Sequence, residues 1–366
     1  MQVTACFSQM GGLRGLLPLL EGAPDFAVRW YGREPVLGYL RARGHAAQPL
    51  DELRFAAGAG GVLVTDTINL SRTQEGALCN VAWRAAAEAG VPSVAFVDCW
   101  WGYLERFVLP GESLAGTPLP DAIAVVDEIA RADMAALAFP EERLHVLGSP
   151  WLASLAEARA GAGANPGAAH AQQGIVPGEL VLSFVSQPLA RVLNDRLSWG
   201  FTERDVVPAL VRACELLPRQ VRDRLRLIFL AHPEEDETGL AALVRERTPS
   251  FRTEVRKEPD PLAVVRACDA VTGMFSILLV EAALCGLPVV SIQPGLKRED
   301  MLVTNRTGAT LAVRDERLLS GVLGRLLCDE DFRAERRTCQ AAFPVVTGAA
   351  GLWRCLLRDL ASGRAQ

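Results

Sequence analysis

The chain has 366 residues, half of them hydrophobic, which predicts two domains with full cores that need no disulfide or metal support. Its formal net charge is −5 and no long basic run occurs, which argues against a nucleic-acid partner. The nine cysteines are scattered without a CxxC pair, and no apolar run could span a bilayer, so we expect a cytoplasmic protein with reduced thiols and no metal site.

The first predicted unit is a strand at residues 3–8, followed by a glycine-bearing turn and a helix over residues 13–20. Such a turn, here with Gly11 and Gly12, is typical of the ligand-binding edge of a parallel sheet. Its backbone N–H groups could share the charge of a phosphate. Alternatively, the two glycines only make the turn into the helix.

Strands and helices then alternate up to residue 150. The sequence predicts strands at residues 26–31, 61–65, 93–97, 122–126 and 144–147, and helices at 35–43, 74–89 and 128–137. Asp66 follows the third strand and Asp98 the fourth, and the carboxyl ends of parallel strands lie at one edge of a sheet. Asp66 and Asp98 should therefore share a site, unless each only caps a helix or orders a loop.

An Ala- and Gly-rich stretch divides the chain. We predict a first Rossmann-like domain over residues 1–152, a linker over 153–178, a second Rossmann-like domain over 179–345, and a C-terminal helix over 346–366 that returns to the first domain. The predicted fold class is α/β, with two parallel sheets that face each other across a cleft.

The second domain repeats the pattern of polar strand ends. A strand at residues 180–185 leads to Ser186 and Gln187, and a strand at 226–230 leads to His232. These residues are candidates for binding a nucleotide phosphate. A histidine at a strand end is also often just hydrogen-bonded to the backbone.

Residues 269–294, DAVTGMFSILLVEAALCGLPVVSIQP, form a strand, a glycine loop, a buried helix and a second strand. Thr272, Gly273 and Ser276 offer hydroxyls and N–H groups at the positive end of the helix dipole, where an anion is stabilised. Glu281 is the only charged residue of the helix, and a buried carboxylate needs donors such as ligand hydroxyls. The alternative is that Ser276 only caps the helix and Glu281 bonds a neighbouring N–H or an arginine.

Three stretches resemble nucleotide-sugar glycosyltransferases of the GT-B fold and the non-hydrolysing nucleotide-sugar 2-epimerases, including the UDP-N-acetylglucosamine 2-epimerases. They are AIAVVDEIARADMAAL with RLHVLGSP, then VLSFVSQPL, and VTGMFSILLVEAALCGLPVVSIQPG, which is the most specific. The resemblance implies that Glu281 holds the ribose hydroxyls and that Gly273, Met274, Phe275 and Ser276 hold the phosphates. LAHPEED resembles the His-Pro motif of bacterial CMP-sugar transferases, which implies that His232 contacts the nucleotide phosphate.

In the first domain, VTDT and VPSVAFVDCWWGYLERF resemble the strand ends that carry acidic catalytic residues in the epimerases. The match departs in detail, because the epimerases have a histidine and glycine before the aspartate and a glutamate on the next strand. Here Val64 and Thr65 precede Asp66, and the next strand ends in Asp98. An epimerase needs acid and base groups, whereas transfer needs one base.

We therefore expect a metal-independent glycosyltransferase that uses a UDP- or CMP-sugar in surface polysaccharide or glycoconjugate synthesis. Its partners would be the nucleotide-sugar donor, as substrate rather than cofactor, and a sugar or glycolipid acceptor, which leaves a peripheral position at the inner membrane face open. Asp98 is the first candidate for the base and Asp66 the second. A 2-epimerase or hydrolase of the same fold and a catalytically silent nucleotide-sugar-binding protein are the alternatives. The aromatic residues after Asp98 fit either a sugar-stacking wall or ordinary core filling.

Overall fold

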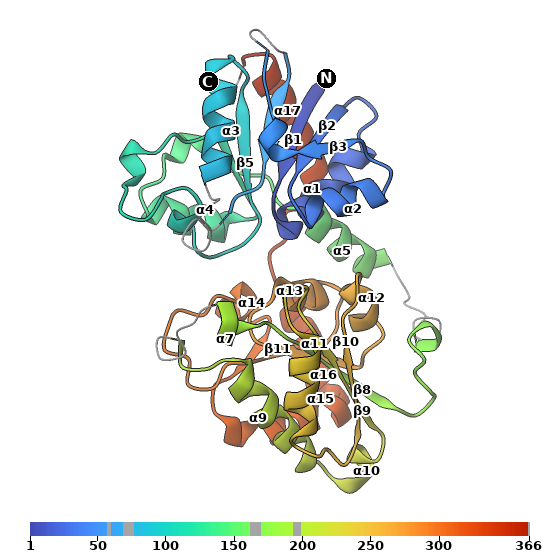
Figure 1. Ribbon diagram of the computed structural model, residues 1–366. Helices are drawn as coiled ribbons and strands as arrows, with labels where there is room; N and C mark the ends of the chain where they lie inside the picture. Colours follow the sequence, from blue (N-terminus) through green and yellow to red (C-terminus); the bar gives the residue numbers. More distant parts are fainter. Residues whose placement is uncertain (57–59, 69–76, 162–169, 193–198, 365–366) are drawn as a thin grey trace. The chain divides into compact units, whose positions relative to one another are not determined.

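The computed structural model describes residues 1–56, 60–68, 77–161, 170–192 and 199–364 (Figure 1). The chain divides into two compact units. Unit 1 comprises Met1–Ser154 and Pro344–Gln366, and unit 2 comprises Leu155–Phe343. Each unit contains one parallel sheet with helices, which confirms the predicted α/β class.

Within the described residues, the sheet of unit 1 has seven strands in the order β3-β2-β1-β4-β5-β6-β7. Its elements are β1 Gln2–Phe7, α1 Met10–Gly22, β2 Ala27–Gly32, α2 Val36–Ala42, β3 Ala47–Pro49, β4 Val62–Thr65, α3 Ala77–Glu88, β5 Ser93–Val97, β6 Ala122–Val125, α4 Glu128–Ala136, β7 Leu144–Val146 and α17 Ala349–Ala361. Single turns of 3₁₀ helix lie at Leu50–Glu52, Leu104–Arg106, Leu114–Gly116 and Glu141–Arg143. The central strands β4 and β5 are buried along their whole length, as expected for a parallel sheet covered by helices on both faces.

The sheet of unit 2 has six strands among the described residues, in the order β10-β9-β8-β11-β12-β13. Its elements are β8 Leu180–Val185, α7 Leu189–Val192, α9 Glu203–Glu215, α10 Arg219–Arg222, β9 Leu225–Leu230, α11 Glu237–Arg245, β10 Arg252–Arg256, α12 Pro261–Val265, β11 Ala270–Gly273, α13 Ile277–Leu284, β12 Val289–Ile292, α14 Val303–Arg306, β13 Leu311–Val313, α15 Glu316–Cys328 and α16 Glu330–Ala341. β11, α13 and β12 correspond to the continuous unit predicted at residues 269–294. Every residue of β11 and β12 is buried, and the two strands pair in parallel. The core therefore fixes the position of their carboxyl ends.

The C-terminal helix α17 belongs to unit 1 (Figure 1). Trp353 and Leu357 of this helix are fully buried, and the Trp353 indole N–H donates to the carbonyl oxygen of Gly148 at 2.9 Å. Its ring makes a T-shaped contact with Phe96 of β5, with centroids 5.5 Å apart and an angle of 81° between the ring planes. The apolar stripe of α17 therefore completes the core of unit 1 around β5.

The predicted linker over residues 153–178 differs from the structure at its beginning. Helix α5, Pro150–Gly161, continues through the first nine of these residues, and Arg159 on it donates to the carbonyl oxygen of Arg337 at 3.0 Å. An Ala-rich run is a strong helix former, so its composition is compatible with a helix as well as with a flexible coil. Residues 162–169 lie outside the described part of the chain. No helix in the described ranges is both long and apolar enough to cross a membrane.

Candidate functional site

Two aspartates of unit 1 follow neighbouring strands of its sheet. Asp66 comes directly after β4 and Asp98 directly after β5, and the two strands pair in parallel. Both side chains therefore lie at the same edge of the sheet, and the charge of Asp98 contributes to a raised pKa of Asp66. The shared sheet edge that the sequence predicts for Asp66 and Asp98 is present in the structure.

Asp66 is 1% exposed and is held by the start of α1. Its Oδ2 accepts from the backbone N–H groups of Ser8 at 2.8 Å and Gln9 at 2.6 Å, and the Ser8 hydroxyl donates to Oδ1 at 3.0 Å. Burial raises the pKa of Asp66 to about 7, against the lowering effect of these hydrogen bonds. Such burial argues against Asp66 as a base that touches substrate, and makes it a residue that fixes the start of α1.

The turn before α1 also differs from the prediction. α1 begins at Met10, so Gly11 and Gly12 lie in its first turn and not in a loop. The N–H groups of Ser8 and Gln9 donate to Asp66, so these two donors bind the protein's own carboxylate in place of the expected phosphate.

Both glycines make room for the aspartates. A Cβ atom at Gly11 would lie 2.3 Å from Oδ2 of Asp98, and one at Gly12 would lie 2.5 Å from Cβ of Asp66. Both distances are shorter than real Cβ contacts allow. Gly11 and Gly12 thus do more than form a turn, because any larger residue would displace one carboxylate.

Asp98 is the more accessible of the two aspartates. Its side chain is 20% exposed, and Nη1 of Arg106 lies 3.4 Å from Oδ1. Burial raises the pKa of Asp98, and the neighbouring guanidinium acts in the opposite direction. Asp98 can therefore contact a ligand while Arg106 stabilises its ionised form.

Arg106 is a site residue to which sequence reasoning gives no role. Its Nη1 donates to the carbonyl and the hydroxyl oxygen of Thr67, both at 3.1 Å, and its Nε donates to the carbonyl oxygen of Trp101 at 3.3 Å. The guanidinium also lies over the Trp101 ring, 5.4 Å from its centroid. Nothing in the sequence separates this buried arginine from the many exposed ones.

The aromatic residues after Asp98 mostly fill the core. Trp100 and Tyr103 are each 5% exposed and Phe107 is fully buried. The Trp100 indole donates to Asp127 at 2.6 Å, and Phe107 stacks on Trp83 with centroids 5.5 Å apart. These contacts favour core filling over a sugar-stacking wall.

In unit 2, the loop between β11 and α13 is fixed from two sides. The Phe275 amide donates to Oε1 of Gln187 at 3.1 Å. The Met274 carbonyl accepts from the Ser291 hydroxyl at 2.7 Å and from Nε2 of Gln293 at 3.1 Å. Gln187 thus positions the loop and the start of α13.

Ser276 is the N-cap of α13, and its hydroxyl accepts from the Leu278 amide at 3.3 Å. The helix start carries the positive end of the dipole and can hold an anion. Glu281, farther along α13, is 4% exposed and is the only charged residue of this helix. The phosphate and ribose roles of these residues stay predictions.

Other predicted contacts of unit 2 are altered by burial. The Thr272 hydroxyl is fully buried and donates to the carbonyl oxygen of Ser183 at 2.9 Å, so the expected contact with a phosphate is not available. The side chain of Met274 is also fully buried. Any ligand contact of Gly273 and Met274 would therefore be made by their backbone.

Ser186 and His232 are joined by Glu235, which sequence reasoning does not single out. The Ser186 hydroxyl donates to Oε1 of Glu235 at 2.8 Å, and Oε2 accepts from the His232 amide at 3.0 Å. The His232 ring accepts from the Glu234 amide through Nδ1 at 3.2 Å. Burial lowers the pKa of His232, so its imidazole is neutral at pH 7 and would approach a phosphate only as a hydrogen-bond donor through Nε2.

Asp300 is a second unpredicted centre, 8% exposed. It accepts from Nε2 of Gln293 and the Leu302 amide, both at 3.0 Å, from Asn305 at 2.9 Å and from Arg314 at 3.1 Å. Since Gln293 also donates to Met274, Asp300 supports the loop before α13 from behind. The described residues contain no group of three or more His, Cys, Asp or Glu side chains suited to a metal ion.

The fold of the chain is similar to that of solved nucleotide-sugar proteins. A Listeria monocytogenes protein assigned as a UDP-N-acetylglucosamine 2-epimerase matches with a TM-score of 0.68 and 14% identity, over 99% of this chain and 97% of that one. The Neisseria meningitidis UDP-GlcNAc 2-epimerase bound to UDP-GlcNAc matches with a TM-score of 0.65 and 10% identity, over 98% and 100% of the two chains. Anabaena Alr3699/HepE in complex with UDP matches with a TM-score of 0.62 and 14% identity, over 99% and 100%.

These similarities confirm the predicted fold, which is the two-domain GT-B-like fold of the 2-epimerases. At such low sequence identity they establish the fold alone. Neither a scan against protein-family models nor a search of curated proteins finds a match to the chain.

Proposed function

We propose that the protein is an enzyme that acts on a UDP-sugar, with the 2-epimerisation of UDP-N-acetylglucosamine as the first candidate reaction. The observation that carries the proposal is Asp98, a partly exposed aspartate with a raised pKa beside an arginine, at a strand end of the fold of UDP-GlcNAc 2-epimerases. Complexes of similar structures with UDP, UDP-GlcNAc and UDP-glucose favour a uridine nucleotide over a cytidine nucleotide.

The reaction needs a group that removes a proton from C2 of the sugar. Asp98 takes this proton as the bond between C1 and the UDP oxygen breaks, which gives UDP and an unsaturated sugar. Return of a proton to the opposite face of C2 and re-addition of UDP at C1 complete the inversion. Asp66 acts through Asp98 and the start of α1, as a positioning residue with no substrate contact.

Nucleotide recognition is assigned to unit 2. Donors at the start of α13 would hold the diphosphate, and Glu281 would accept from the ribose hydroxyls. The loop that presents these groups is already fixed by Gln187, Ser291 and Gln293, so binding needs little ordering of this segment.

Glycosyl transfer is the second candidate, and one observation favours it. Of the two aspartates, only Asp98 is accessible, and transfer to an acceptor hydroxyl needs a single base. An epimerase, by contrast, needs a second group to return the proton on the other face of C2.

Incubation with UDP-N-acetylglucosamine in D₂O, without acceptor, distinguishes the candidates. Epimerisation predicts that the C2 proton signal disappears from the NMR spectrum and that the C2 epimer forms, and that Asp98→Asn loses both. If the C2 proton does not exchange without an acceptor, but UDP is released when sugar acceptors are added, the reaction is glycosyl transfer and not epimerisation. Absence of both reactions, with no stabilisation of the protein by UDP in thermal unfolding, would refute the proposed function.

A further inference from the structure

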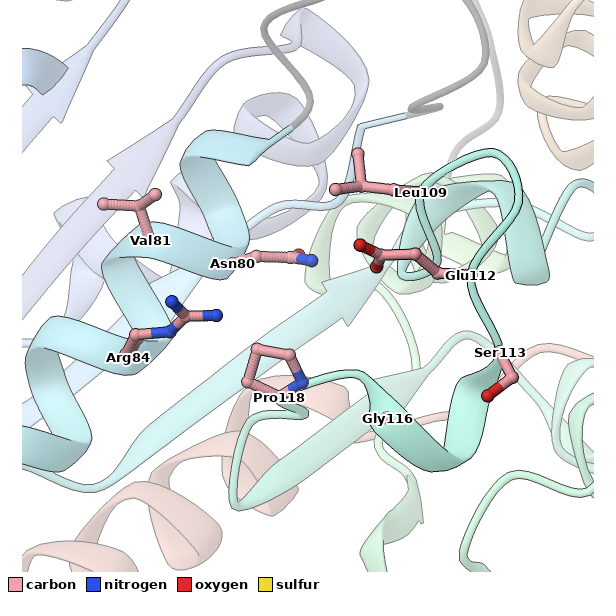
Figure 2. Close-up of a pocket in the computed structure, with 8 residues that line it drawn as sticks. All are labelled: Asn80, Val81, Arg84, Leu109, Glu112, Ser113, Gly116 and Pro118. Atoms are coloured by element: carbon pink, nitrogen blue, oxygen red, sulfur yellow. The ribbon is translucent and has the colours of Figure 1, made fainter.

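Unit 1 carries a cavity of about 450 Å³ that the proposed chemistry does not use. It lies between α3 and the segment 109–118, which follows β5, and is lined by Asn80, Arg84, Leu109, Glu112, Ser113 and Pro118 among others. Figure 2 shows the amide of Asn80, the guanidinium of Arg84 and the carboxylate of Glu112 pointing toward the same space.

Two of these side chains carry opposite charges that are not paired with each other. Among the residues that the structure describes, neither Arg84 nor Glu112 makes an ion pair or a side-chain hydrogen bond. Both side chains are exposed on the cavity wall, so they are available to a ligand. Their charges cancel, which disfavours an occupant with a large net charge of either sign.

Asn80 adds an independent observation. The residue is 8% exposed, and its Nδ2 donates to the carbonyl oxygen of Phe107 at 3.1 Å. Its Oδ1 is buried and has no hydrogen-bond partner among the described residues. A buried amide oxygen without a donor is unfavourable, so a ligand that donates to it recovers free energy.

We propose that this cavity binds a neutral carbohydrate. Hydroxyl groups can donate to Oδ1 of Asn80 and to Glu112 and also accept from Arg84, a combination that a purely anionic or cationic molecule does not provide. The side chains of Leu109 and Pro118 supply apolar surface for the ring carbons. The neutral Ser113 hydroxyl at the rim offers one further donor and acceptor.

The cavity is connected to the aspartate site through the backbone. Asn80 follows Cys79, whose thiol lies 3.6 Å from the carbonyl oxygen of Asp66. The carbonyl that Asn80 binds belongs to Phe107, the residue after Arg106. Sugar binding can nevertheless be measured without nucleotide or turnover, so the proposal stands or fails separately from the proposed function.

Saturation-transfer difference NMR on the full chain tests the proposal with glucose, galactose and N-acetylglucosamine as probes. We expect signals from at least one sugar, and a Kd about tenfold higher in Arg84→Gln and in Glu112→Gln. Glu88→Gln, an exposed carboxylate on α3 outside the cavity lining, is the matched control and should bind like the parent.

Two results would overturn the assignment. They are no sugar signal from the parent protein, or sugar binding that both cavity variants retain unchanged. The two substituted residues are exposed, and a circular dichroism spectrum identical to that of the parent shows that each variant is folded.

Discussion

Replacing Asp66 by asparagine should stabilise unit 1 at neutral and alkaline pH. The amide fits the site, because its Oδ1 can take the place of the carboxylate Oδ2 and accept from the Ser8 and Gln9 amides. Its Nδ2 then faces the Ser8 hydroxyl, which can turn and accept. The substitution therefore removes the charge and keeps the hydrogen bonds.

The magnitude follows from the pKa of Asp66. Burial raises this pKa from 3.8 to about 7, a difference that corresponds to about 4 kcal/mol. Between these pH values the folded state binds more protons than the unfolded state. The free energy of unfolding of the parent therefore falls as the pH rises from about 4 toward 7. The asparagine variant lacks this loss. Its advantage over the parent should grow by about 2 to 3 kcal/mol between pH 5 and pH 8.

Urea unfolding followed by tryptophan fluorescence measures the effect. Of the seven tryptophans only Trp199 lies in unit 2, so the signal reports unit 1. Asp51→Asn, which removes an exposed carboxylate of the same unit, should show no such growth. If Asp66→Asn were less stable than the parent by the same amount at every pH, Asp66 would be an ordinary ionised carboxylate and the reasoning would fail.

Three further predictions concern the sites. Gly11→Ala places Cβ 2.3 Å from Asp98 and should lower kcat about 100-fold, whereas Gly22→Ala at the other end of α1, where Cβ meets nothing within 4 Å, should leave kcat unchanged. Arg106→Lys removes part of the charge-assisted contact with Asp98, so the pKa of Asp98 should rise. The acid limb of the pH–kcat profile should then move to higher pH. An acid limb that does not move would show that Arg106 has no part in catalysis. Glu281→Gln should weaken UDP binding about tenfold, and an unchanged Kd would remove Glu281 from nucleotide contact.

The shared sheet edge was predictable because strands and their carboxyl ends follow from local sequence patterns. Asp66 and Asp98 each come directly after an apolar run, and parallel strands place such residues together. The loop before α13 is equally visible, since one continuous stretch contains the strand, the cap and the helix. What the sequence could not give is each side chain's partner.

Those partners come from distant parts of the chain. Thr272 lies in a stretch whose sequence is typical of a phosphate-binding loop. Its position on β11 nevertheless directs its hydroxyl to the carbonyl oxygen of Ser183 on β8. Arg106 and Asp300 gain their roles from contacts with several segments. A single sequence shows that such residues are polar, and only the packed structure shows that they are buried and bonded.

The start of α1 shows how local propensity and tertiary structure oppose each other. Two successive glycines each disfavour a helix by about 1 kcal/mol relative to alanine, which is why the pattern predicts a later beginning. The helix nevertheless begins at Met10, where the buried Asp66 carboxylate lies close to the positive end of the helix and accepts two preceding N–H groups. Alanine would suit the helix better, but its methyl group would collide with Asp98 at one position and with Asp66 at the other. The two glycines therefore lower the stability of the helix, but they allow both carboxylates to approach it. The site at this sheet edge thus explains why a sequence unfavourable for a helix occurs here.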